Sequence, residues 1–75
     1  MSNKLQYLIV IEQGSNSYGA YVPDLPGCVA VGESREEAVE LIQEAIAMHL
    51  EDLRDRGEAI PPPHSSSEVI EISAA

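Results

Sequence analysis

The sequence predicts an α+β domain with the element order β-β-β-α-β, in which one antiparallel sheet is covered by one long helix. Two observations predict it. Apolar residues alternate along short N-terminal segments, and after a helix-capping motif they recur at spacings of three and four residues. The chain has 75 residues, of which 44% are apolar, with neither Phe nor Trp. We therefore expect a single domain, residues 1–75, with a small aliphatic core that favours self-association.

The first strand is expected from Lys4 to Glu12. There Leu5, Tyr7, Ile9 and Ile11 alternate with residues of the other face, a period of two that is typical of strands. Leu8 and Val10 make part of the second face apolar as well, which favours a central strand. The polar segment 13–17 contains Gly14 and Asn16 and is expected to reverse the chain into a hairpin.

The second strand is expected from Tyr18 to Val22 and the third from Cys28 to Gly32. A corner separates them. Pro23 and Pro26 each lack a backbone donor and bias the preceding residue to extended geometry, while Gly27 tolerates a left-handed turn. The corner therefore ends one strand and returns the chain into the next.

A helix is expected from Arg35 to Arg56. Ser34 and Glu37 form an S-x-x-E capping box at its start, and Gly57 is the natural residue just past its end. One face of the helix carries the apolar or packed positions Ala38, Leu41, Ile42, Ala45, Ile46, His49 and Leu53. At 1.5 Å per residue this helix is roughly 33 Å long and extends beyond the strands that it covers.

A connector and a last strand follow the helix. Pro61, Pro62 and Pro63 stiffen the connector, and the serines at 65–67 make it flexible again. Residues 68–72, with Val69, Ile70 and Ile72, are expected to form the final strand of the sheet.

The charge balance is strongly acidic. Thirteen acidic residues oppose four basic ones, which gives a formal net charge of -9. This disfavours a phosphate-binding or nucleic-acid-binding surface, because such surfaces need clustered Lys and Arg. A basic protein partner fits the charge better. The plain alternative is that the charge only keeps a small protein in solution.

Candidate chemical groups are sparse. Asp24 and Glu33 are the nearest candidates for a two-metal nuclease site, but each has an ordinary interpretation as a turn or surface residue. His64 lies in the flexible connector without further ligands at metal-site spacing, and the single cysteine, Cys28, fits a small buried side chain. His49 is expected to pack on the apolar side of the helix. We expect no catalysis, no metal and no cofactor.

One stretch is more specific than the rest. Residues 18–28, Y-G-A-Y-V-P-D-L-P-G-C, are followed by the S-R-E-E-A helix start at 34–38. This combination resembles the HicB antitoxin family, and the resemblance extends from Tyr7 to about Ile72. It implies a partial RNase H-like fold. It also implies an antitoxin that binds and occludes a basic, mRNA-cleaving toxin of the HicA type.

The expected partner-binding residues combine both lines of reasoning. They lie on the second strand, the corner and the helix, namely Tyr18, Tyr21, Asp24, Glu36, Glu40 and Glu44. The two tyrosines differ by three positions and point to opposite faces, so one is expected in the core and the other toward a partner. The glutamates form either an acidic docking face or an ordinary solvated helix surface.

Many HicB proteins continue into a DNA-binding domain, which we do not expect in residues 1–75. We expect a homodimer or higher homo-oligomer. We expect it in the cytoplasm, because the longest N-terminal apolar run, 7–11, is too short for a membrane span or signal peptide. The alternative function is an orphan homo-oligomeric interaction or scaffold module without a toxin partner.

Overall fold

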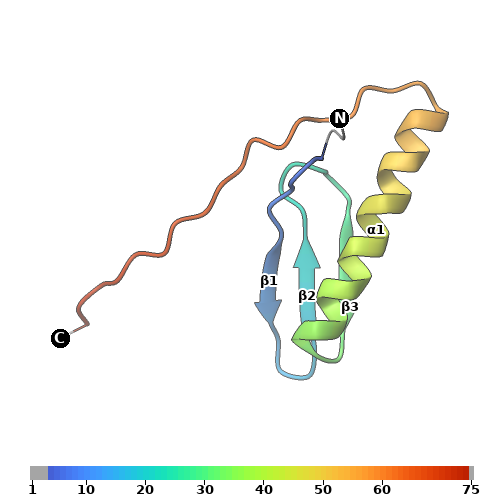
Figure 1. Ribbon diagram of the computed structural model, residues 1–75. Helices are drawn as coiled ribbons and strands as arrows, with labels where there is room; N and C mark the ends of the chain where they lie inside the picture. The colour runs from blue at the N-terminus through green and yellow to red at the C-terminus, as the bar shows by residue number, and fades with distance from the viewer. Residues whose placement is uncertain (1–3, 75) are drawn as a thin grey trace.

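The computed structural model describes residues 4–74 and shows three antiparallel strands followed by one helix (Figure 1). The sheet has the order β1-β2-β3, with β1 at Val10–Gln13, β2 at Tyr18–Tyr21 and β3 at Val29–Gly32. Helix α1, Arg35–Asp55, lies across one face of the sheet and packs mainly on β3 and β2. The expected α+β class is confirmed. Residues 1–3 and 75 of the expected domain lie outside the described part.

Strand β1 starts later than the alternation predicts, at Val10 instead of Lys4. Its pairing with β2 runs from Val10 opposite Tyr21 to Gln13 opposite Tyr18. Beyond Tyr21 the partner strand reaches Pro23 and turns away, so the residues before Val10 have no ladder to join. Tyr7 and Ile9 nevertheless pack against the core, which explains why the apolar alternation begins before the strand does.

The corner between β2 and β3 consists of two successive four-residue turns. The N–H of Leu25 donates to the carbonyl of Val22 at 3.1 Å, and the N–H of Cys28 donates to the carbonyl of Leu25 at 3.1 Å. In the second turn Pro26 is followed by Gly27 at φ 85°, the arrangement of a type II turn, which needs a positive φ at its third residue. The two turns bury Leu25 completely and place Asp24 beside the C-terminal connector.

Both ends of α1 carry the expected caps. The Ser34 hydroxyl accepts the Glu37 N–H at 3.1 Å, while the Glu37 carboxylate accepts the N–H of Glu33 rather than that of Ser34, at 2.6 Å. At the other end Gly57 has φ 70° and donates to Arg54, and Glu58 donates to Leu53. These two bonds form a Schellman motif, which satisfies carbonyls that a helix end otherwise leaves free.

The core lies between the helix and one face of the sheet. Its buried apolar members are Ala20, Val22, Leu25, Cys28, Ala38 and Ile42. His49 is half-buried on α1, as the sequence pattern predicts, whereas Leu41 of the predicted apolar face is exposed. No helix of residues 4–74 covers the other face of the sheet, so the described part of the chain is a two-layer structure with one open side.

The prediction of a fourth strand at residues 68–72 is wrong for the single chain. Residues 68–72 are extended but pair with no strand, and Figure 1 shows the C-terminal segment leaving the body of the molecule. Alternation of apolar residues fits a strand, but a strand also needs a partner edge within reach. Here the connector directs the segment away from the sheet of its own chain. The RNase H-like arrangement, which needs this strand, stays a prediction.

Gly32 allows β3 and the start of α1 to approach closely. A Cβ atom at this position would lie 2.7 Å from the backbone nitrogen of Ala38, which is closer than real contacts permit. A Cβ at Gly19, by contrast, would meet no atom within 4 Å. The two glycines lie on neighbouring strands, Gly32 opposite Tyr18 and Gly19 opposite Val31, and so form a natural pair for comparison.

We therefore predict that Gly32→Ala lowers the free energy of unfolding by about 1–3 kcal/mol, the usual cost of overpacking. Gly19→Ala should leave it unchanged or raise it slightly, because Ala loses less backbone entropy on folding. Urea denaturation followed by circular dichroism measures both values. Equal effects of the two substitutions would contradict the close approach of β3 and α1.

Candidate functional site

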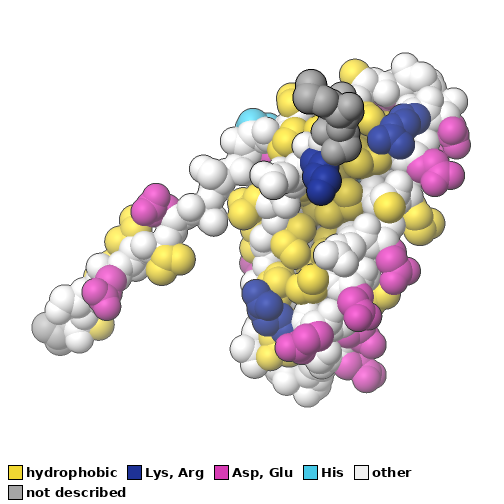
Figure 2. Space-filling model, in the orientation of Figure 1, with side chains coloured by type: hydrophobic (Ala, Val, Ile, Leu, Met, Phe, Trp, Pro, Cys, Tyr) yellow, Lys and Arg dark blue, Asp and Glu magenta, His cyan; other side chains and the backbone are white. Residues whose placement is uncertain are grey.

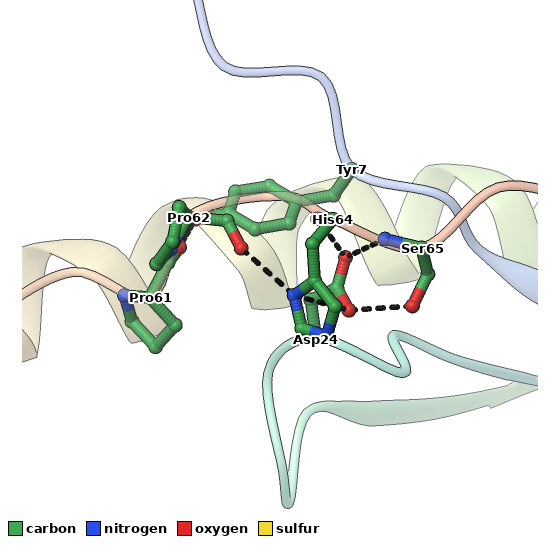
Figure 3. A network of polar contacts seen from close by, with 6 residues as sticks. All are labelled: Tyr7, Asp24, Pro61, Pro62, His64 and Ser65. Carbon is green, nitrogen blue, oxygen red and sulfur yellow. Dashed lines mark hydrogen bonds and ion pairs between the residues drawn. The ribbon is translucent and has the colours of Figure 1, made fainter.

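The most ordered polar cluster of the described chain surrounds Asp24 (Figure 3). One carboxylate oxygen accepts the backbone N–H of His64 at 2.9 Å and that of Ser65 at 3.0 Å. The other oxygen accepts the Ser65 hydroxyl at 2.6 Å and lies 3.2 Å from Nδ1 of His64. Asp24 is only 4% exposed, so a carboxylate of the corner is enclosed by the connector.

These bonds favour the charged form of the carboxyl group. The Ser65 hydroxyl contributes most, the Ser65 and His64 N–H groups add to it, and together they lower the pKa of Asp24 to about 2 against the opposing effect of burial. The carboxyl group of Asp24 is therefore ionised in the folded protein at ordinary pH. Its contribution to stability is present above the pKa of an unfolded Asp, near 3.9, and is lost as the pH falls through about 2.

Tyr7 holds the same connector from the opposite side. Its hydroxyl donates to the carbonyl oxygen of Pro61. Burial raises the pKa of Tyr7, and the nearby negative charge of Asp24 raises it further, so the phenol keeps the proton that it donates. Residues 61–65 are thus fixed at both ends by side chains of the N-terminal half. We call this arrangement the connector clamp, formed by Tyr7 and Asp24 on one side and Pro61, His64 and Ser65 on the other.

The connector clamp brings together a Ser, a His and an Asp, but not in the order that nucleophilic catalysis requires. In a triad the His lies between the other two and accepts the Ser proton. Here the Ser65 hydroxyl donates directly to Asp24, and the His64 ring lies near Asp24 and the Pro62 carbonyl. The arrangement positions a loop and offers no base to the Ser65 hydroxyl.

The expected partner-binding residues do not form one site. Asp24 belongs to the connector clamp, where its oxygens are already occupied. Tyr18 and Tyr21 lie on opposite faces of β2, as the sequence predicts: Tyr18 packs against the core, whereas Tyr21 is 39% exposed on the open face. Which of them meets a partner stays a prediction.

The open face of the sheet is apolar around Tyr21. Tyr21 is opposite Val10 on β1 and opposite Val29 on β3. Val29 is 63% exposed and Val31 is 66% exposed. Three adjacent strands therefore present a row of aromatic and branched side chains to solvent, a combination that is common at interfaces.

The three glutamates lie on the helix, on the other layer of the molecule. Glu36, Glu40 and Glu44 are exposed and spaced by four residues, so they follow one side of α1. Figure 2 shows acidic side chains gathered along the helix. The acidic row and the open apolar face are thus separate surfaces on separate layers.

A groove separates the inner side of β1 from the start of α1. It has a volume of about 410 Å³ and is lined by Ile9, Ile11, Gln13, Tyr18 and Arg35. Figure 2 shows hydrophobic side chains along this strip, with a dark blue side chain at each end. The groove exists because α1 packs on β3 and β2 more than on β1.

Other chemical groups are poorly placed for reactions. Cys28 is buried, and burial raises the pKa of its thiol, which disfavours the reactive thiolate. Residues 4–74 contain no group of three His, Cys, Asp or Glu side chains that could hold a metal ion. Within the same residues, no helix is both long enough and apolar enough to cross a membrane.

Sequence reasoning missed most of the connector clamp. It assigned Asp24 to a turn and His64 to a flexible connector, and it gave no role to Tyr7 or to Ser65 as a ligand. The clamp joins residues about forty positions apart, and Asp24 in a proline corner gives no signal for its distant partner. Only the Pro-rich composition of 61–63 indicated a connector with a defined path.

Comparison with known proteins identifies the family. The profile described as HicB_like antitoxin of bacterial toxin-antitoxin system matches residues 7–74. The chain belongs to the HicB-like antitoxin family.

Relatives of this HicB-like chain occur in bacteria and archaea. A UPF0150 protein of Helicobacter pylori is 54% identical over 44 residues, which cover 59% of this chain and 61% of that protein. A UPF0150 protein of Thermoplasma acidophilum is 36% identical over 76% of this chain and 84% of its own length. Antitoxin HicB 2 of Photorhabdus laumondii is 29% identical over the whole of this chain but only 55% of its own length. This chain therefore spans less than two thirds of the length of two of these three relatives.

Two solved structures are similar to this HicB-like fold. The N-terminal domain of the antitoxin HicB of Burkholderia pseudomallei superposes with a TM-score of 0.68 at 34% identity, covering 77% of this chain and 69% of that domain. A chain of the HicA3 and HicB3 toxin-antitoxin complex superposes with a TM-score of 0.67 at 32% identity, covering 79% and 70%. The expected membership of the HicB family is thus confirmed.

We predict that Asp24→Asn releases the connector from the corner. The Asn side chain has an NH₂ group in place of one carboxylate oxygen. At least one donor of residues 64–65 therefore faces another donor and loses its hydrogen bond. Amide exchange measured by NMR should show faster exchange at His64 and Ser65. Asp52→Asn, which removes only an exposed ion pair with Arg56, is the matched control and should leave both amides protected.

The same clamp predicts a pH dependence. In the wild type, the amide signals of His64 and Ser65 should shift as the pH falls toward about 2, when Asp24 takes up its proton. The signals of Asp24→Asn should stay constant over this acid range. Identical titrations of the two proteins would contradict a carboxylate contact at residue 24.

Proposed function

We propose that this HicB-like chain is an antitoxin that binds and occludes a basic, mRNA-cleaving toxin of the HicA type, with no enzymatic step of its own. The observation that carries the proposal is the family match over residues 7–74. It is supported by the similarity to a chain from a complex between a HicA3 toxin and a HicB3 antitoxin.

The charge distribution supports the same proposal. A toxin that binds RNA needs a positive surface. This chain has a formal net charge of -9, and three exposed glutamates follow one side of α1. An acidic helix that faces a basic RNA-binding surface competes with RNA for the same contacts. Direct binding of this chain to nucleic acid is disfavoured for the same reason. The proposed site of action is the cytoplasm, where mRNA is the toxin's substrate.

We further propose that the active species is a homodimer or a higher homo-oligomer. The core of the single chain is small, and Tyr21, Val29 and Val31 expose apolar surface on the open side of the sheet. These exposed side chains also favour the second candidate function, an orphan interaction or scaffold module that assembles without a toxin. The two functions differ in one requirement, a toxin gene next to that of the antitoxin.

The first experiment is therefore co-expression of this chain with the product of a short, Lys- and Arg-rich reading frame beside its gene. Rescue of growth and co-purification of the two proteins support the antitoxin function. Absence of such a frame, together with purification of this chain alone from its source cells, supports the scaffold function instead.

We predict that reversal of the acidic row, Glu36→Lys with Glu40→Lys and Glu44→Lys, slows association with that toxin. The reduction should be about tenfold or more at low salt, because exposed charges act mainly on the association rate. It should shrink near physiological salt, where the Debye length is about 8 Å. Stopped-flow or surface-binding kinetics measure the rate.

The matched control reverses three exposed acids outside α1, Glu12→Lys with Glu33→Lys and Glu58→Lys, and so changes the net charge equally. It should slow association much less. If both triple variants bind at the same rate, only the total charge matters. If neither differs from wild type, the docking site lies on the sheet, on the open face around Tyr21.

A further inference from the structure

The C-terminal segment, residues 66–74, has exposed apolar side chains and no strand partner among the described residues. Val69 is 97% exposed, Ile70 71% and Ile72 78%. The segment is extended and has no strand partner within the described residues. Its departure from the body also lengthens the molecule to 52 Å along one axis. The radius of gyration is 14.7 Å, although a compact domain of this length has roughly 11 Å.

The outer edge of β1 is a second place where backbone hydrogen-bonding groups have no partner strand among the described residues. The sheet order β1-β2-β3 leaves one side of β1 without a partner strand, and its free N–H and C=O groups can pair with an added strand. The same edge borders the groove lined by Ile9, Ile11 and Arg35. Its volume of about 410 Å³ lies within the range of pockets that enclose small ligands, roughly 300–1,000 Å³.

We propose that residues 68–72 of one copy of this chain add as a fourth strand to the β1 edge of a second copy, and that the second copy returns its own segment in the same way. This exchange specifies how the proposed homo-oligomer is built and does not depend on toxin binding. It extends the sheet by main-chain hydrogen bonds and covers the groove with side chains.

The side chains of the segment fit this position. Side chains two residues apart share one face of a strand, so Ile70 and Ile72 enter the groove beside Ile9 and Ile11, while Val69 and Glu71 lie on the other face. Charges also match. Arg35 lines the groove, and Glu68 shares the strand face of Ile70 and Ile72 that would enter it. The groove thus presents one basic side chain, Arg35, to an acidic and aliphatic strand in a molecule that is strongly acidic.

A second copy fits better than the same chain. The connector clamp fixes residues 61–65, and the segment then leaves in a direction away from the body, as Figure 1 shows. In this structure the segment lies away from its own β1, so docking there requires the chain to bend back toward the sheet after the clamp. A single five-residue strand also covers little surface, whereas specific interfaces bury roughly 1,200–2,000 Å². Reciprocal exchange uses two segments and two grooves, and so doubles the buried area.

Sedimentation equilibrium at micromolar concentration tests the proposal on the full chain. The wild type should sediment as at least twice the 8.1 kDa mass of one chain. Ile70→Glu with Ile72→Glu should give a species of single-chain mass, because carboxylates cannot enter the groove. Both residues are exposed in the single chain, so its helical circular dichroism should be retained.

The matched control is Ser66→Glu with Ser73→Glu, which adds the same charge to the segment outside residues 68–72. It should assemble as the wild type does. A wild type of single-chain mass overturns the proposal. An oligomer whose mass is unchanged by Ile70→Glu with Ile72→Glu also overturns it, and then points to the open face around Tyr21 as the contact between copies.

Energy transfer separates exchange between copies from docking within one chain. One dye is attached at Gln6→Cys, before β1, and the other at Ser73→Cys in the segment, while buried Cys28 stays unlabelled. Excess unlabelled protein should abolish the transfer in doubly labelled chains if the segment crosses to a second copy. Transfer that survives this dilution shows docking within one chain and overturns the proposal. Neutralisation of the toxin is measured separately, so failure here leaves the proposed antitoxin function intact, whereas a wild type of single-chain mass also contradicts the proposed homo-oligomer.

Discussion

The buried carboxylate of Asp24 decides how the two halves of this molecule are related. It lies in a corner whose two turns are set by Pro23, Pro26 and Gly27, and it accepts three hydrogen bonds from residues 64 and 65. Charge-assisted bonds of this kind are stronger than neutral ones, and an enclosed carboxylate that lost them would carry a large desolvation cost. The exit direction of the C-terminal segment therefore depends on the corner of the N-terminal sheet.

Local signals in the sequence were sufficient for most of the fold. Ser34, Glu37 and Gly57 define the helix ends because each acts on backbone groups within a few residues. Pro23 and Gly27 define the corner in the same way. The non-local features were not predictable. The start of β1 depends on where its partner strand turns away. The path of residues 68–72 depends on a clamp in which Asp24 binds residues some forty positions later in the chain. The alternation of apolar residues predicts neither the start of β1 nor this path.

The candidate site shows the same division. The sequence correctly placed Tyr18 and Tyr21 on opposite faces, because the period of a strand is two. It placed Asp24 of the corner in the same partner-binding set as the two tyrosines and the glutamates of the helix. Burial separates them: Asp24 is enclosed and already bonded, while Glu36, Glu40 and Glu44 remain exposed. Charge was read correctly from the sequence, but the availability of each charge depends on the fold.

The proposed toxin binding and the proposed self-assembly use different surfaces. The acidic row lies on α1, whereas the free edge of β1 and the open apolar face belong to the sheet. The groove at the β1 edge reaches α1 only at its first residue, Arg35, so contacts between copies there leave the rest of the acidic side of the helix free. Assembly also matters for stability, since a domain near this size buries only roughly 60% of the surface of its unfolded chain. A ligand or a second copy that binds only the folded form adds stability in proportion to the logarithm of its concentration. Under the proposed function and the proposed exchange, the amount of folded protein depends on its own concentration and on that of the toxin, and the clamp at Asp24 holds the segment in the direction from which exchange would begin.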